Sequence, residues 1–91
     1  MRVDWTPRSL ADLDRVEAFL QPKSMAAAVT LKKRILTALD LLTLTPRMGA
    51  PITHSAGVEI RRVIIDEYEI RYRLKGHAIQ IIRLRHSRED Q

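Results

Sequence analysis

The spacing of the apolar residues changes halfway along this chain, and that change constrains the fold more than any other feature. Up to about residue 44, leucines and valines recur every three or four residues, which is the period of an amphipathic helix. From residue 58 onward, apolar and charged residues largely alternate, which is typical of strands with one buried face. The sequence therefore predicts a helical half followed by a sheet half, an α+β architecture.

The first helix is predicted directly after a short strand at residues 2–5. Thr6 suits the N-cap, and Pro7 suits the first helical position because its missing N–H has no partner there. The helix is expected to end near residue 20, before the sequence QPKS. Its predicted apolar stripe consists of Leu10, Leu13, Val16 and Leu20.

The second helix is predicted from a cap at Ser24 to about residue 44, before Pro46. Its core-facing stripe is Leu31, Ile35, Leu39 and Leu42. Four further apolar residues lie off that stripe: Val29, Leu36, Leu41 and Leu44. Either this helix is buried on two sides of a compact fold, or part of its apolar surface binds a partner helix.

The sheet half is predicted as a loop at 52–57 followed by strands at 58–65, 68–74 and 78–85. The last strand has isoleucines on both parities, so we expect a bulge near Ile81 or burial on both faces. The expected order is β-α-α-β-β-β, a helical hairpin packed on a small antiparallel sheet. With 91 residues, the chain is expected to form one domain, 1–91.

The positive charge is concentrated in the sheet half. Residues 61–88 carry eight basic and three acidic side chains, so this stretch alone accounts for the net charge of +5. The chain has twelve arginines and four lysines, and the guanidinium fork suits carboxylate or phosphate partners. We expect the arginines to form a surface that lacks enough acidic partners within the chain and binds an acidic partner.

Several functional classes are disfavoured by composition. The chain has no cysteine, which excludes disulfides and thiol catalysis, and its three histidines share no metal-ligand spacing. We therefore expect no metal and no cofactor. No apolar stretch is long enough to cross a membrane, and the first residues lack the apolar core of a secretion signal, so a cytoplasmic protein is expected.

Short motifs in order along nearly the whole chain are similar to those of one bacterial family. They are a Trp before a Pro-started helix, LTLTPRMGAP at the end of the second helix, Gly-x-x-x-Arg at 57–61, YEIRY at 68–72, and the closing IQIIRLRHSR. Together they resemble the RelE/ParE superfamily of toxins from type II toxin–antitoxin systems. The resemblance implies growth arrest, a role in plasmid maintenance, and a proteinaceous antitoxin partner.

The superfamily has a branch that cleaves mRNA on the ribosome and a branch that inhibits DNA gyrase and so blocks replication. A ribonuclease here would use His86 as acid or base, with Arg61 and Arg83 holding phosphate. However, no tyrosine follows residue 72, and the segment APITHSAG has no lysine. The ending LRHSR is similar to the ParE-like, gyrase-inhibiting branch, which would make the protein a binding inhibitor rather than an enzyme.

The resemblance also assigns candidate residues. The target-binding residues that we expect are Arg61, Arg83, Arg85, His86 and Arg88. A groove between the helices and the sheet is expected to bind a ParD-like, ribbon-helix-helix antitoxin with an acidic amphipathic tail, through Leu13, Val16, Leu20, Leu36, Leu41, Arg71 and Arg73. Arg61 is also expected to be structured by backbone carbonyls or a carboxylate, and His86 to be a hydrogen-bonded residue at the end of its strand.

Overall fold

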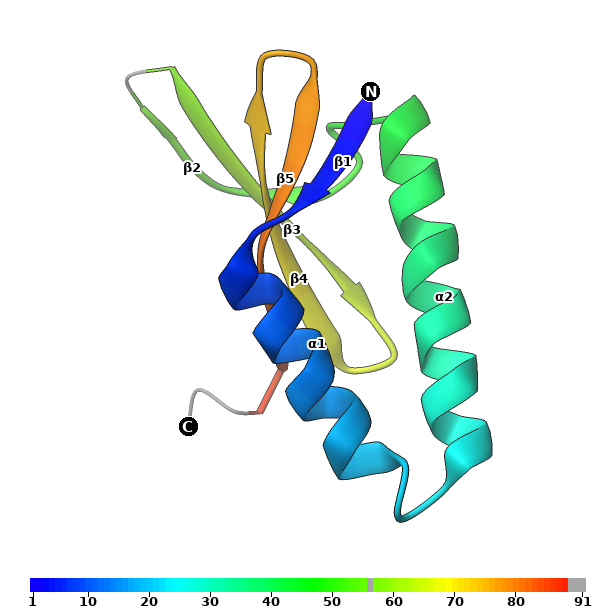
Figure 1. The fold of residues 1–91 in the computed structure, drawn as a ribbon. Coiled ribbons are helices and arrows are strands. Elements are labelled where there is room, and N and C mark those ends of the chain that lie inside the picture. The colour runs from blue at the N-terminus through cyan, green and yellow to red at the C-terminus, as the bar shows by residue number, and fades with distance from the viewer. Residues whose placement is uncertain (56, 89–91) are drawn as a thin grey trace.

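Two helices pack on one face of a five-stranded mixed sheet (Figure 1). The structure is a computed structural model that describes residues 1–55 and 57–88, without the side chains at 54 and 55. The sheet order is β1-β5-β4-β3-β2. The elements are β1 Arg2–Trp5, α1 Pro7–Leu20, α2 Met25–Leu44, β2 Ala50–Ser55, β3 Val58–Ile65, β4 Tyr68–Lys75 and β5 Ala78–His86.

The predicted α+β class and the hairpin of two helices are confirmed. Two features of the sheet differ from the prediction. Residues 52–55, predicted as loop, belong to β2, an edge strand that pairs antiparallel with β3. The short β1 pairs parallel with the first half of β5, so the sheet is not purely antiparallel.

Both predicted helix caps are present. The Thr6 hydroxyl accepts the backbone N–H of Ser9 at 3.1 Å, and the Ser24 hydroxyl accepts the N–H of Ala27 at 3.1 Å. These bonds satisfy backbone donors that have no partner within the first turn of a helix. The caps therefore explain why α1 and α2 begin where the sequence indicates.

The face of α1 that is buried differs from the predicted apolar stripe by a rotation about the helix axis. The buried positions are Ser9, Asp12 and Val16, whereas Leu10 is 48% exposed. Leu13 and Leu20 are partly buried and pack against the core. The prediction of Leu10 as a core residue is wrong because two polar residues, rather than leucines, occupy the face that meets β5.

The stripe predicted for α2 is confirmed, since Leu31, Ile35, Leu39 and Leu42 are all buried. The four apolar residues off the stripe are each at least 46% exposed: Val29, Leu36, Leu41 and Leu44. Burial of α2 on two sides within the chain is therefore wrong. The helix presents apolar side chains to the exterior on more than one flank.

A β-bulge in β5 explains why its isoleucines occupy both parities. Arg71 of β4 pairs with Arg83, but the next residue, Tyr72, pairs with Ile81, so Ile82 is the extra residue. The bulge lets both Ile81 and the later Leu84 point into the core with no exposed surface. The bulge predicted near Ile81 is confirmed.

Gly49 and Tyr72 lock the turn after α2 against the sheet. The Tyr72 hydroxyl donates to the Pro46 carbonyl at 2.7 Å and accepts the Gly49 N–H at 3.0 Å. A Cβ atom on Gly49 would lie 2.6 Å from both the Arg62 carbonyl oxygen and the Tyr72 hydroxyl. Only glycine allows this close approach of the turn to the sheet. Burial raises the pKa of Tyr72 despite the bond from Gly49, so its hydroxyl stays protonated.

Candidate functional site

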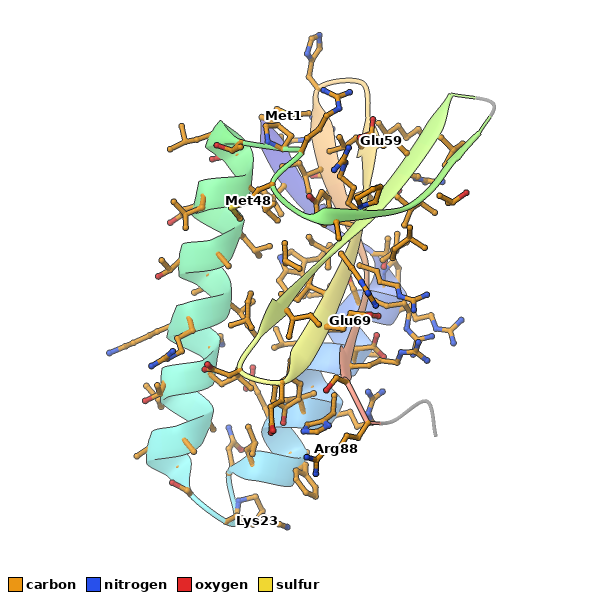
Figure 2. The ribbon with its side chains drawn as sticks, turned by 180° about the vertical axis from the view of Figure 1, so that it is seen from behind. Met1, Lys23, Met48, Glu59, Glu69 and Arg88 are labelled. Atoms are coloured by element: carbon orange, nitrogen blue, oxygen red, sulfur yellow. The ribbon has the colours of Figure 1, made fainter. Side chains whose placement is uncertain are left out.

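The face of the sheet opposite the helices collects most of the basic side chains. Figure 2 shows this side, with β3 and β4 in front of α1. Side chains alternate between the two faces along each strand, and directly paired residues of neighbouring strands lie on the same face. Every second residue of β3, β4 and β5 therefore points to this open face. The charged residues that these three strands present to it are Arg62, Glu69, Arg71, Arg73, Lys75, Arg83 and Arg85. We call this set the arginine face; it has six basic residues and one carboxylate.

Three arginines form a row across the middle of the arginine face. Arg62 of β3 pairs with Arg71 of β4, which pairs with Arg83 of β5. Directly opposed like charges destabilise a sheet unless they are neutralised. Glu69, labelled in Figure 2, accepts from Arg71 Nε at 2.6 Å and from Arg62 Nη1 at 3.1 Å. The row is therefore held together by a carboxylate in the same face.

Asp12 of α1 neutralises the third arginine, and sequence reasoning missed it. Its carboxylate accepts from Arg83 Nε at 2.9 Å, from the backbone N–H of Leu84 at 2.9 Å, and from Arg15 Nη1 at 3.0 Å. β1 is too short to pair with this part of β5, so Asp12 supplies the acceptor that a longer β1 would have provided. The available signal was its spacing from Ser9 and Val16, which places it on the buried face of α1.

The environment of both carboxylates favours their charged forms. Burial alone would raise the pKa of Asp12, but hydrogen bonds from Arg83, Leu84 and Arg15 outweigh it, and the pKa lies below the usual value. Glu69 has the same balance: burial opposes ionisation, the bonds from Arg71 and Arg62 favour it, and its pKa is lowered. Both residues are therefore anions at neutral pH and fix the arginines around them.

Two further members of the arginine face, Arg73 and Arg85, lie beside polar residues of the neighbouring strand. Arg73 donates from Nε to the Gln80 side-chain oxygen at 3.0 Å and also contacts it through Nη2. Arg85 lies directly opposite Glu69 in the ladder between β4 and β5. The expectation that the arginines lack acidic partners within the chain is thus only partly right, because Asp12 lies outside the stretch that the sequence singled out.

His86 closes β5 as the predicted hydrogen-bonded histidine. Its Nδ1 accepts the backbone N–H of Arg88 at 3.2 Å, and its Nε2 lies 3.4 Å from a Glu67 carboxylate oxygen. Its ring meets the Tyr68 ring edge-on, with centroids 5.2 Å apart. A hollow of about 360 Å³ lies beside it, lined by Arg15, Val16, Phe19, Tyr68, His86 and Arg88. His86 and Arg88 therefore border an apolar depression with a basic rim.

Arg61 lies on the other face of the sheet. Its Nη1 donates to the carbonyl oxygens of Gly49 at 2.7 Å and Arg47 at 3.2 Å, and its Nε donates to Glu59 at 2.6 Å. The prediction that Arg61 is structured by carbonyls and a carboxylate is confirmed. Glu59 also binds Arg47, and the hydrogen bonds from Arg61 and Arg47 hold the pKa of Glu59 below its usual value. Arg62, the neighbour of Arg61, points to the open face.

The three residues of a candidate ribonuclease site do not converge. Arg83 is on the arginine face, whereas Arg61 and His86 have the parity of the core face. Arg61 pairs with Tyr72 and His86 pairs with Tyr68, which are four residues apart, about 14 Å along a strand. Among residues 1–55 and 57–88, no cluster of three or more His, Asp or Glu side chains is arranged to hold a metal.

The candidate antitoxin residues occupy two kinds of position. Leu13, Val16 and Leu20 belong to the core or pack against it, and Leu36 and Leu41 are each 50% exposed. One hollow of about 420 Å³ lies between the end of α1, the first half of α2 and the β3–β4 turn, and Leu20 lines it. Another, of about 340 Å³, lies between Leu41 and Ile65. Hollows thus exist where the helices meet the sheet.

Comparison with known proteins gives one consistent family. The family model described as ParE toxin of type II toxin-antitoxin system, parDE, matches residues 3–91. The chain belongs to the ParE toxin family. Toxin RelE2 of Caulobacter vibrioides is 33% identical over 86 residues, which cover 94% of each chain. The family therefore agrees with the resemblance seen in the motifs, and its relatives carry names from both branches of the superfamily.

A solved structure supports the fold of this ParE-family chain. The structure described as the chromosomal ParDE TA system from P. aeruginosa matches with a TM-score of 0.71 and 22% identity, over 94% of this chain and 95% of that chain. The two helices on one face of a sheet are thus a shared architecture. Among the described residues, no helix is long and apolar enough to cross a membrane.

Proposed function

We propose that this ParE-family protein is a cytoplasmic toxin that inhibits DNA gyrase by binding it, and so blocks replication. The observation that carries this proposal is the separation of the candidate acid–base and phosphate-binding groups on two faces of the sheet. Cleavage of RNA requires such groups within reach of one phosphate. A binding inhibitor requires no such convergence, only accessible contacts. Arg83 and Arg85 lie on the arginine face, and His86 and Arg88 form the basic rim of the hollow at the end of β5.

Supercoiling assays test this proposal directly. Purified protein added to gyrase and relaxed plasmid is expected to lower supercoiling activity, and expression in bacteria is expected to give elongated cells that do not divide. The Arg83→Gln, Arg85→Gln pair should weaken inhibition at least tenfold. The control pair Arg8→Gln, Lys33→Gln removes equal charge from exposed positions on the helices and should leave it unchanged. Codon-specific mRNA cleavage with intact gyrase activity would overturn the proposal.

A ribosome-dependent ribonuclease is the second candidate function. The name of the relative Toxin RelE2 favours it, as does the pairing of His86 with Glu67 at 3.4 Å, which could support proton transfer. His86→Ala discriminates between the candidates. It should abolish cleavage by a nuclease, and it should reduce gyrase inhibition only a few fold if the histidine serves the surface of a binding inhibitor.

Neutralisation by a ParD-like antitoxin is part of the proposed function. The family description and the related ParDE structure support a toxin–antitoxin pair. The exposed leucines of α2 and the hollows at the helix–sheet junction suit the apolar side of an amphipathic segment. An acidic continuation of that segment that passes round the edge of the sheet would reach Arg71 and Arg73, which lie on the same face as Arg83 and Arg85. Antitoxin binding would then cover the residues that contact the target.

A further inference from the structure

The net charge of the protein resides on the arginine face. Its strands present six basic residues and one carboxylate to the open side. The two helices on the other side carry five basic and four acidic side chains, so they are nearly neutral. Among the described residues, the arginine face thus has a much larger excess of positive charge than the two helices, and such an excess attracts a polyanion.

The guanidinium groups at the centre of this face are held in fixed orientations. Arg71 and Arg83 each donate their Nε to a carboxylate, at 2.6 Å to Glu69 and at 2.9 Å to Asp12. Both carboxylates are buried, with side chains 11% and 4% exposed. A guanidinium that is anchored through Nε has further N–H donors on its two terminal nitrogens. Such preorganisation lowers the entropy lost when an arginine binds an anion.

The spacing of these arginines suits a repeating anion. Arg62, Arg71 and Arg83 follow one another across three strands at about 5 Å per strand. Arg71 and Arg73, like Arg83 and Arg85, are two residues apart, about 7 Å along a strand. Fixed positive charges therefore form a two-dimensional grid on the sheet, with separations comparable to those between successive phosphates of a nucleic acid strand.

The composition of the face favours a duplex backbone over the alternatives. Single-stranded nucleic acid is bound by stacking on aromatic rings, but none of the four aromatic residues lies on this face: Trp5, Phe19, Tyr68 and Tyr72. A protein–protein interface has an apolar centre and a polar rim. Here arginines lie on all three inner strands, β5, β4 and β3, so the centre of this face is charged, and the apolar Ile60 and Ile64 lie beside Arg62 on β3.

We infer that the arginine face binds the phosphate backbone of double-stranded DNA, independently of sequence. The arginine row donates to phosphate oxygens, and the buried carboxylates behind it keep the guanidinium groups in place. This inference deepens the proposed function, on which it rests for its biological setting, because gyrase holds duplex DNA while it acts. The toxin would then contact the enzyme and the bound DNA together.

Fluorescence anisotropy with a short labelled duplex of arbitrary sequence tests the inference on the full-length protein. Binding is expected at about 50 mM salt, and the logarithm of the association constant should fall with log salt by about 0.9 for each phosphate contacted. The Arg71→Gln, Arg83→Gln pair should lower affinity at least tenfold and reduce that slope by about 1 for each arginine. The control pair Arg8→Gln, Lys33→Gln removes the same charge from the helix side and should change the affinity less than threefold.

A second pair protects the test against misfolding. Arg73 and Lys75 lie on the same face, and neither is part of the ion pairs of Asp12 or Glu69. Arg73→Gln, Lys75→Gln should therefore weaken binding while thermal unfolding stays close to wild type. The inference is overturned if the duplex does not bind at low salt, if both face pairs lose no more affinity than the helix pair, or if a single strand binds more tightly than its duplex. It is also overturned if the protein binds no duplex while the face variants lose affinity for DNA-free gyrase, because the arginine face would then contact the enzyme itself.

Failure of the inference and failure of the proposed function give different results. Gyrase inhibition without duplex binding would support the proposed function and contradict the inferred DNA contact. Duplex binding without gyrase inhibition leaves the arginine face as a DNA surface and removes the proposed target. If both the inference and the proposed function are right, the Arg71→Gln, Arg83→Gln pair should inhibit supercoiling less than wild type. Footprinting should then show less toxin-dependent protection of the DNA held by gyrase.

Discussion

Three buried carboxylates organise the arginines of this protein. Each binds two guanidinium groups, and together they engage six of the twelve arginines. The clusters are Asp12 with Arg15 and Arg83, Glu59 with Arg47 and Arg61, and Glu69 with Arg62 and Arg71. Each cluster keeps one net positive charge, so the carboxylates fix the arginines in place without abolishing their attraction for an anion.

Asp12→Asn should destabilise the fold because an amide cannot replace a carboxylate that accepts from three donors. The change leaves two guanidinium groups without their counter-ion, and we expect the free energy of unfolding to fall by about 1–3 kcal/mol. Urea denaturation measures the loss. Asp14→Asn, at an exposed position two residues further along α1, should change stability by less than about 0.5 kcal/mol. Equal stability of the two variants would show that Asp12 does not tie α1 to β5.

Gly49→Ala should destabilise the turn after α2 by about 3 kcal/mol, because its Cβ would meet a backbone oxygen and the buried Tyr72 ring. Gly76→Ala is the control. Its site is open and only its φ of 58° opposes a side chain, so the expected loss is about 1 kcal/mol. Thermal unfolding of both variants separates close packing from backbone conformation. A smaller loss at Gly49 than at Gly76 would contradict the packing argument.

At the level of elements, the sequence predicted the regular parts well and the edges poorly. The second helix was found from its apolar stripe at three- and four-residue spacing, and β4 from its clean alternation. β3 and β5 were found as apolar-rich runs bounded by turn residues. β2 was missed because Pro51 and the lack of alternation read as a loop, although an edge strand tolerates proline. The phase of α1 was wrong because Asp12 is buried by partners distant in sequence, which no local pattern reveals.

The same limit applies to the candidate site. Alternation along β4 correctly placed Arg71 and Arg73 opposite the tyrosines, and the bulge in β5 was anticipated. The direct pairing of Arg71 with Arg83 depends on the exact position of that bulge, which the sequence placed only near Ile81. Whether Arg61 joins the other arginines also depends on register. A bulge shifts the register by one residue and so moves every later side chain of its strand to the other face of the sheet. An error of one position in the bulge therefore changes which residues share the arginine face.

The two flanks of α2 offer a test of where the antitoxin docks. Leu36 lies on the flank that faces α1, where Lys32 contacts Glu17, whereas Leu41 lines the hollow beside Ile65 of β3. Leu36→Lys and Leu41→Lys should each weaken antitoxin binding at least tenfold, measured by calorimetry, since each places a charge on an apolar contact. Both side chains are half exposed, so the fold should remain stable.

The control for these variants is Leu44→Lys at the end of α2. Leu44 is the last residue of α2 and is 81% exposed, so the same substitution there should leave antitoxin affinity unchanged. If only one of the two leucines matters, the segment lies along one flank of α2 rather than across both. Wild-type affinity in both variants would place the antitoxin elsewhere on the toxin.

On the scale of the whole molecule, the carboxylate clusters join parts that are distant in sequence. Asp12 links α1 to β5, Glu59 links β3 to the turn after α2 through Arg47, and Glu69 links β3 to β4. The helix layer and the arginine face are thus connected by groups that must stay ionised. Stability and the arrangement of the proposed DNA-binding surface should depend on pH together.

Acid should therefore unfold this protein through these three groups. Each has a folded-state pKa below the value near 4 expected in the unfolded chain, so each stabilises the fold above that value. That contribution is lost as the pH falls from about 5 through the lowered pKa values, because the unfolded chain then binds more protons than the folded one.

Urea denaturation at pH 7, 5, 4 and 3 should show nearly constant stability down to about pH 5 and a steep fall below it. In Asp12→Asn, which starts from lower stability, the fall should be shallower because one of the three groups no longer titrates. A wild-type stability that rises as the pH drops from 5 to 3 would contradict the role given to these carboxylates.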